Sequence, residues 1–190
     1  FDFRIKGVDE LITQTHTVLF EACNTSIQAH FQVSPKQFAN TYNWAQIISG
    51  PVMAACTNSP LLLGKRLWHE TRIALFQQIV ELSNSSSDLR ENYSRAVFGH
   101  AWVKDSVLEI FKTDIARYDV LLSDPNKIDA LKQLQEGQLP KLKGLNLFNG
   151  TVYKWNRPCY GVTNGKPHLR IECRYLPSGP TVLDEMANMA

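Results

Sequence analysis

The segment "PHLRIECRY", residues 167–175, constrains the fold of this chain most strongly, because polar and apolar side chains alternate along it without a break. The polar positions are His168, Arg170, Glu172 and Arg174, and the apolar positions are Leu169, Ile171, Cys173 and Tyr175. A period of two is typical of a β-strand with one buried face. A tight-turn sequence, "TNGK" at 163–166, precedes it, and "GTVYKWNRP" at 150–158 is a further strand candidate that Pro158 would end. Together these segments predict a β-hairpin.

A second alternating segment, "SIQAHFQV" at 26–33, has the same design. Its polar positions are Ser26, Gln28, His30 and Gln32, and its apolar positions are Ile27, Ala29, Phe31 and Val33. We therefore expect a third strand with one polar face. If the strands share one sheet, their polar positions gather on one side of it.

Helices are expected between and after these strands. Ser34 as N-cap and Pro35 at the first helical position predict a helix that runs to about residue 56. Further helices are expected at 68–82, 101–118 and 126–136, and after the N-cap Thr181, whereas 7–22 is only weakly helical and 57–68 and 83–88 are loops. Long helices with one early strand and a late hairpin predict an α+β fold with an antiparallel sheet.

Length and composition fit one globular domain over residues 1–190. The chain is 44% hydrophobic and carries a net charge of +2, without the concentrated basic excess of a nucleic-acid or membrane-surface protein. No apolar run of about 18 residues predicts a transmembrane helix. The abrupt start and end suggest a piece of a longer protein, so a partner segment upstream in the same chain is expected.

The four cysteines do not form a metal or redox motif, because no CxxC pair occurs. A chain of this size does not need disulfides, so we expect reduced thiols and a cytoplasmic protein. The phosphate-binding motifs GxGxxG and GxxxxGK[ST] are also absent, and no GxSxG marks a serine nucleophile.

The polar faces of the predicted strands combine a carboxylate, a histidine and several arginines. A carboxylate and a histidine can hold a divalent cation, and guanidinium groups bind phosphate or carboxylate through paired hydrogen bonds. Metal and phosphate together suggest phosphoryl transfer. The alternative is a solvated face of an antiparallel sheet, which is the commoner explanation of such a pattern.

Two further groups of polar residues leave alternatives open. In "GKRLWHETR", Lys65 to His69 could begin an anion-binding loop, although a solvated helical face explains Lys65 and His69 better. In "WNRP", Arg157 could clamp a substrate or stack on Trp155.

Four segments, "TSIQAHFQV", "NSPLLLGKRLWHETRIALFQQ", "NGTVYKWNRP" and "PHLRIECRYLPSGPT", together resemble the glutamate–cysteine ligase family. The similarity is to its second bacterial branch of carboxylate–amine ligases, from about residue 20 to the end, and includes the family order of the segments. The resemblance implies part of a glutamine-synthetase-like catalytic fold. It also implies ATP-dependent ligation, as in glutathione biosynthesis. ATP and Mg²⁺ or Mn²⁺ would convert the side chain of glutamate, or of a similar amino acid, to an acyl phosphate that an amine attacks.

The resemblance also implies roles for individual residues. His30 and Glu172 would bind metal, Arg174 would contact the transferring phosphate, and Arg72 and Arg157 would bind the amino-acid substrate. Gln28 and Gln32, on the same strand side as His30, would lie next to the ATP. His168 and Arg170 match no family role.

One departure from the family pattern bears on activity. Family members open with an acidic strand resembling "GVELE", and "KGVDEL" at 6–11 is a poor match to it. We therefore expect little ligase activity from these 190 residues alone. The alternative is a non-catalytic or regulatory relative that binds an amino acid or nucleotide. The amine, and whether the chain forms a homo-oligomer, are not predicted.

Overall fold

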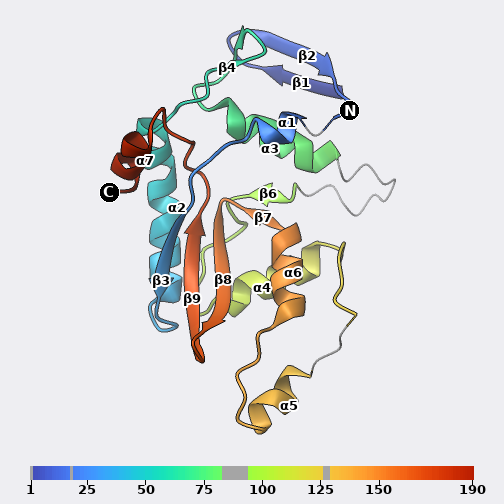
Figure 1. Ribbon diagram of the computed structural model, residues 1–190, viewed down its shortest axis with the longest axis vertical. Coiled ribbons are helices and arrows are strands. Elements are labelled where there is room, and N and C mark those ends of the chain that lie inside the picture. Colours follow the sequence, from blue (N-terminus) through green and yellow to red (C-terminus); the bar gives the residue numbers. More distant parts are fainter. Residues whose placement is uncertain (1, 18, 83–93, 126–128) are drawn as a thin grey trace. The chain divides into compact units, whose positions relative to one another are not determined.

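The computed structural model describes residues 2–17, 19–82, 94–125 and 129–190 as a mixed α+β structure with small antiparallel sheets (Figure 1). These residues form two compact units. The first unit comprises 1–29, 47–96 and 174–190, and the second comprises 30–46 and 97–173. No helix in the described part of the chain is long and apolar enough to cross a bilayer.

The first unit begins with an antiparallel hairpin of β1 (Asp2–Lys6) and β2 (Glu10–Gln14). It continues with α1 (Leu19–Ala22), the short hairpin of β4 (Leu61–Leu62) and β5 (Lys65–Arg66), and α3 (Thr71–Leu82). Alternation in β1 buries Phe3 and Ile5, which form a core with four other apolar residues: Leu11, Phe20, Leu67 and Leu75. The last element, α7 (Val182–Met189), starts at the predicted N-cap Thr181, which forms a capping box with Asp184.

The second unit contains a three-stranded sheet in the order β3 (Ala29–Val33), β9 (Lys166–Cys173), β8 (Asn156–Thr163). The first half of α2 (Phe38–Ala55) belongs to this unit, together with α4 (Leu108–Arg117), α5 (Ala130–Gln135) and α6 (Lys143–Thr151). β6 (Ala96–Val97) pairs with β7 (Tyr153–Lys154). Tyr118, Phe148 and Val152 form a small core beside α4 and α6.

The predicted hairpin is confirmed as β8 and β9, which pair antiparallel over their whole length from Asn156–Cys173 to Thr163–Lys166. The turn between them places Asn164 at φ 50° and Gly165 at φ 69°. Two successive positive φ angles are what a two-residue hairpin turn requires, and Asn-Gly adopts them at the lowest cost. The turn sequence therefore fixes which residues of the two strands face each other.

Several predicted boundaries are wrong. The 7–22 segment contains strand β2 before a single helical turn, and 57–68 contains the β4–β5 hairpin. The helix expected at 101–118 starts only at Leu108. The strand expected at 150–158 is divided among the end of α6, β7 and the start of β8, which runs from Asn156 through Pro158 to Thr163. α6 was not expected at all. The loop predicted at 83–88 and the first residues of the helix predicted at 126–136 lie outside the described residues.

Candidate functional site

The polar face of the β8–β9 hairpin brings three of the predicted polar residues together. The cross-strand pairs on this side are Arg157–Glu172, Cys159–Arg170 and Gly161–His168. Directly paired residues of an antiparallel sheet point to the same face. We call these six residues the hairpin polar face. Its assembly confirms that His168, Arg170 and Glu172 share one side, and it adds Arg157 and Cys159 from the neighbouring strand.

A bifurcated ion pair forms the centre of this face. Arg157 donates from Nε and from Nη2 to the same oxygen of Glu172, Oε2, at 2.9 and 2.6 Å. The side chain of Glu172 is 1% exposed, whereas that of Arg157 is 22% exposed. Burial acts to lower the pKa of Arg157, but its hydrogen bond to Glu172 and the charge of that carboxylate raise it overall. A solvated sheet face does not explain this end of the hairpin, because its carboxylate is buried.

Cys159 belongs to the same cluster. Its Sγ donates to Glu172 Oε2 over 3.2 Å, and the residue is buried. Burial raises the pKa of the Cys159 thiol to about 11, with Arg157 acting in the opposite direction. The thiol is therefore protonated at neutral pH and serves as a weak donor to the carboxylate.

The turn end of the face is shaped by His168. Its ring lies so close to Gly161 that a Cβ on that glycine would approach His168 Cε1 to 2.6 Å. His168 Nε2 also lies 3.1 Å from the hydroxyl of Thr163. Gly161 thus leaves room for the imidazole to lie flat across the neighbouring strand.

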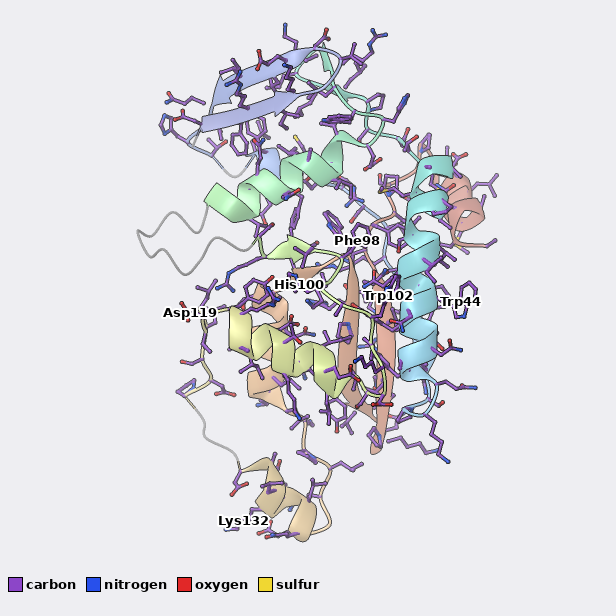
Figure 2. The ribbon with its side chains drawn as sticks, turned by 180° about the vertical axis from the view of Figure 1, so that it is seen from behind. Trp44, Phe98, His100, Trp102, Asp119 and Lys132 are labelled. Atoms are coloured by element: carbon purple, nitrogen blue, oxygen red, sulfur yellow. The ribbon has the colours of Figure 1, made fainter. Side chains whose placement is uncertain are left out.

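The other face of the hairpin is fixed by helices of the second unit. Tyr42 of α2 donates to the backbone carbonyl of Asn156 at 2.9 Å, and Asn149 of α6 donates to that of Pro158 at 2.8 Å. Burial raises the pKa of Tyr42 well above its ordinary value, so this phenol remains a donor at any physiological pH. In Figure 2, α4 and the first half of α2 are seen on either side of β8 and β9. These contacts hold one side of the hairpin.

Two of the three residues predicted on the other strand lie in the same sheet. His30 and Gln32 are exposed on β3, which neighbours β9, and Gln28 is exposed just before β3. Among the described residues, no group of three or more His, Cys, Asp or Glu side chains is placed to hold a metal ion. The binding of a metal by His30 and Glu172 stays a prediction.

Arg72 and Arg174 lie in the first unit, where Arg72 binds protein groups. Its Nε donates to Glu70 Oε1 at 3.0 Å, and its two terminal nitrogens donate to the backbone carbonyls of Arg174 and Tyr175. Arg72 and Glu70 are both buried, and the second oxygen of Glu70 accepts from the amide of Asn58 at 3.2 Å. The structure thus assigns Arg72 to holding the segment that follows β9.

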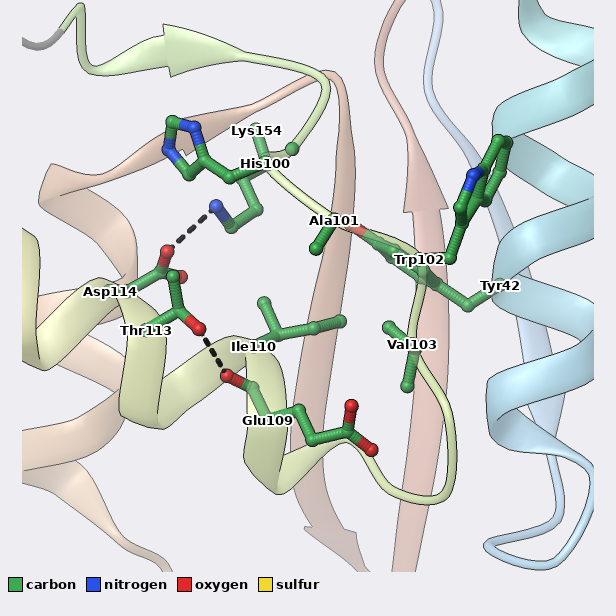
Figure 3. Close-up of a pocket in the computed structure, with 11 residues that line it drawn as sticks. Tyr42, His100, Ala101, Trp102, Val103, Glu109, Ile110, Thr113, Asp114 and Lys154 are labelled. Atoms are coloured by element: carbon green, nitrogen blue, oxygen red, sulfur yellow. Dashed lines mark hydrogen bonds and ion pairs between the residues drawn. The ribbon is translucent and has the colours of Figure 1, made fainter.

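The sequence did not predict a second polar cluster, the buried ion pair between Lys154 of β7 and Asp114 of α4 (Figure 3). Lys154 Nζ lies 2.7 Å from Asp114 Oδ1, and both side chains are 2% exposed. Burial raises the pKa of Asp114, with the charge of Lys154 acting in the opposite direction. The pair lines a cavity of about 80 Å³ under the 99–103 segment.

A helical signal for Asp114 was present in the sequence. Ile110, Phe111, Asp114 and Tyr118 recur at the three- and four-residue spacing of one helix face, and all four are buried. A carboxylate among apolar residues on one face requires a cationic partner. Lys154 supplies it from "VYKW", where it is the one charged residue among an aliphatic and two aromatic residues.

Comparison of the chain with protein-family models, with curated proteins and with solved structures gives no match.

Proposed function

We propose that the chain contributes the hairpin wall of an ATP-dependent carboxylate–amine ligase site, as its resemblance to the glutamate–cysteine ligase family implies. In a departure from the residue roles that the resemblance implies, we assign phosphate binding to Arg157 and Arg170, the two arginines of the hairpin polar face. The acid substrate is glutamate or a similar amino acid, and the acceptor is an amine. We also propose a cytoplasmic location, as expected from the sequence.

The observation that carries the proposal is the bifurcated contact of Arg157 with Glu172. It orients a guanidinium whose side chain remains 22% exposed. Guanidinium groups held in this way suit planar, paired recognition of phosphate. Arg170 pairs with Cys159 on the same face, and its Nε has no partner among the described residues. Two guanidiniums around one carboxylate leave this face with a positive charge.

The residues fit phosphate better than metal. Glu172 would contribute one metal ligand, and His30 a second from β3, but Glu172 Oε2 already accepts from Arg157. When bound, Mg²⁺ would neutralise charge on the phosphates. The roles that we assign to this chain's own residues are phosphate binding by Arg157 and orientation of Arg157 by Glu172.

The alternative is a non-catalytic relative that binds a nucleotide or an amino acid. It is favoured by Arg72, because this predicted substrate residue donates to Glu70 and to two backbone carbonyls of the protein. Both functions predict binding of Mg²⁺–ATP, but only the ligase predicts its cleavage.

The test measures ADP release by the full-length protein with Mg²⁺–ATP, glutamate and a panel of amines, alongside titration of Mg²⁺–ATP by calorimetry. ADP release that requires both an acid and an amine supports the ligase. Binding of ATP without ADP release under any combination supports the non-catalytic alternative. Absence of both would leave the hairpin polar face without a nucleotide function and overturn the proposal.

Arg157→Met is the informative variant, and Lys166→Met is its matched control. Both remove one positive charge from the same hairpin, but Lys166 is exposed at the turn and outside the cluster. We expect Arg157→Met to weaken ATP binding at least tenfold and Lys166→Met to change it less than twofold. Equal effects of the two would show a nonspecific charge effect and count against a built site.

A further inference from the structure

The cavity beside the Lys154–Asp114 pair is separate from the hairpin polar face and has no role in the proposed ligase. It is lined by α4, by the 99–103 segment, by Tyr42 and by Lys154, all in the second unit (Figure 3). Its volume of about 80 Å³ gives room for roughly five non-hydrogen atoms, since one water-sized group needs about 10–15 Å³ on this measure.

The polar groups of the lining are mostly occupied. Tyr42 donates to the carbonyl of Asn156, and Thr113 donates to that of Glu109. The Glu109 carboxylate accepts from the backbone amides of residues 104–106. His100 Nε2 lies 3.3 Å from the hydroxyl of Tyr118. Besides the second ring nitrogen of His100, the buried ion pair is therefore the main source of a donor and an acceptor for a ligand.

The ion pair has unused capacity on both partners. Asp114 Oδ2 is buried and accepts no hydrogen bond from the described residues, although a carboxylate can accept about four. Lys154 carries three N–H donors, and the only partner that the described residues give it is Asp114. An acceptor and a donor with free capacity thus lie side by side at the cavity wall.

The charge of the pair limits the chemistry of a ligand. Lys154 and Asp114 neutralise each other, so a charged ligand would leave one net charge buried, which is costly. A zwitterionic ligand would have to lose the water around both of its charged groups on entering the cavity. A primary carboxamide is neutral, and its C=O and N–H₂ groups lie next to each other as the donor and acceptor of the pair do. Val103 and Ile110 supply an apolar wall for a short alkyl group.

We propose that this cavity is a binding site for a small primary carboxamide. Its carbonyl oxygen accepts from Lys154 Nζ, and its N–H₂ donates to Asp114 Oδ2. Its alkyl group packs against Val103 and Ile110. The exposed side chain of Ala101 lies at the cavity and leaves it open.

The test is an NMR titration of the ¹⁵N-labelled chain with propionamide, and with propionate, propylammonium and glycine as matched ligands of similar size. We expect saturable shifts of the Val103 and Ile110 amides with propionamide, and binding at least tenfold weaker for the other three. No saturable shift with propionamide would overturn the proposal, and so would equal binding of any charged ligand or of glycine.

Two variants locate the site. Ala101→Phe should fill the cavity and weaken propionamide binding at least tenfold, whereas Ala116→Phe, an exposed position of α4 that does not line the cavity, should leave it unchanged. The double variant Asp114→Asn with Lys154→Met removes the pair without leaving one buried charge, and should also abolish binding. Unchanged binding in Ala101→Phe, or in a folded double variant, would place the ligand elsewhere and overturn the assignment.

Discussion

Each unit of this molecule contains a buried arginine–glutamate pair, and the two pairs differ in what else the arginine contacts. Arg72 and Glu70 of the first unit have side chains 4% and 5% exposed, and the other nitrogens of Arg72 donate to two backbone carbonyls. Arg157 of the second unit donates twice to one oxygen of Glu172 and remains partly exposed. We call the Arg72–Glu70 pair the closed pair, because protein groups accept from all the nitrogens of its arginine. We call the Arg157–Glu172 pair the open pair, because its arginine remains partly exposed.

The difference shows how to separate a structural arginine from one that can bind a ligand. An arginine with all of its nitrogens committed to the protein has nothing left for a substrate, and its removal leaves carbonyls and a carboxylate buried without partners. An arginine held by one carboxylate is oriented but keeps donors. The family resemblance implies substrate binding by both Arg72 and Arg157, and the contacts distinguish the two arginines.

The largest effect is expected from breaking the closed pair. Arg72→Met leaves the buried Glu70 without its cation and should lower the free energy of unfolding by about 3–5 kcal/mol, as for other broken buried pairs. Urea denaturation measures it. Arg66→Met, an exposed arginine of β5, is the control and should change stability by less than about 0.5 kcal/mol. A loss below about 1 kcal/mol in Arg72→Met would show that the closed pair is not structural.

Substitution of Arg157 in the open pair should lower stability less than substitution of Arg72, and should weaken ATP binding more. Arg157→Met also strips a buried carboxylate of its cation, but the exposed edge of the pair lets water reach it, so we expect a loss of about 2 kcal/mol. Arg157→Lys retains the charge without the forked donors and should restore part of that stability but little of the ATP binding. Denaturation and calorimetry on the two variants separate these effects. Full restoration of ATP binding by lysine would contradict a forked geometry.

The hairpin could be predicted from sequence because its determinants are local. Alternation over 167–175 and the Asn-Gly turn together fixed the strands and the shared side of His168, Arg170 and Glu172. The strand end predicted at Pro158 is wrong, because proline is tolerated in a strand wherever no neighbouring strand needs its missing N–H. β8 is an edge strand in the order β3-β9-β8, where a missing N–H costs no ladder bond on the open side.

The predicted helix boundaries are wrong where a side chain that does not follow the helical periodicity determines the start of the helix. Glu109 accepts three hydrogen bonds from the amides of residues 104–106 and so holds that segment as a loop before α4. α6 was missed because Gly144 and Gly150 lower helix propensity, yet Phe148 and Asn149 are buried and fix it by packing.

The candidate site was predicted in part. Alternation grouped the residues of one strand, but the partners of Glu172 depend on the register of a second strand, which brings Arg157 and Cys159 to it. The Lys154–Asp114 pair needed a contact between residues 40 positions apart, and no local pattern encodes such a contact. Arg72 matched a family segment, but only the structure shows its two carbonyl partners.

The open pair has a titratable neighbour that the closed pair lacks, and alkaline pH should expose this difference. The Cys159 thiol has its pKa raised from 9.0 to about 11 by burial, so the unfolded chain loses this proton first as pH rises. Stability should therefore fall between about pH 9 and 11, by about 1–2 kcal/mol for this thiol. Burial raises the pKa of Cys173 to about 11 as well, so Cys159→Ala should reduce the slope without removing it. Urea denaturation at pH 8, 9, 10 and 11 measures the fall in the free energy of unfolding with pH. An unchanged slope in Cys159→Ala would exclude this thiol as a source.

The smallest effect concerns the support of the closed pair by a single hydroxyl. Ser59 Oγ accepts from the backbone amide of Arg72 at 3.2 Å, so Ser59→Ala should cost about 1 kcal/mol of stability, the usual value of one hydrogen bond. Because the first unit's pair is structural, ATP binding should not change. Thr163→Ala removes the hydroxyl next to His168 on the hairpin and is the comparison variant, with a loss of no more than about 0.5 kcal/mol at its exposed position. If Ser59→Ala weakened ATP binding while leaving stability intact, Arg72 would belong to a ligand site after all, and the distinction between the closed and open pairs would fail.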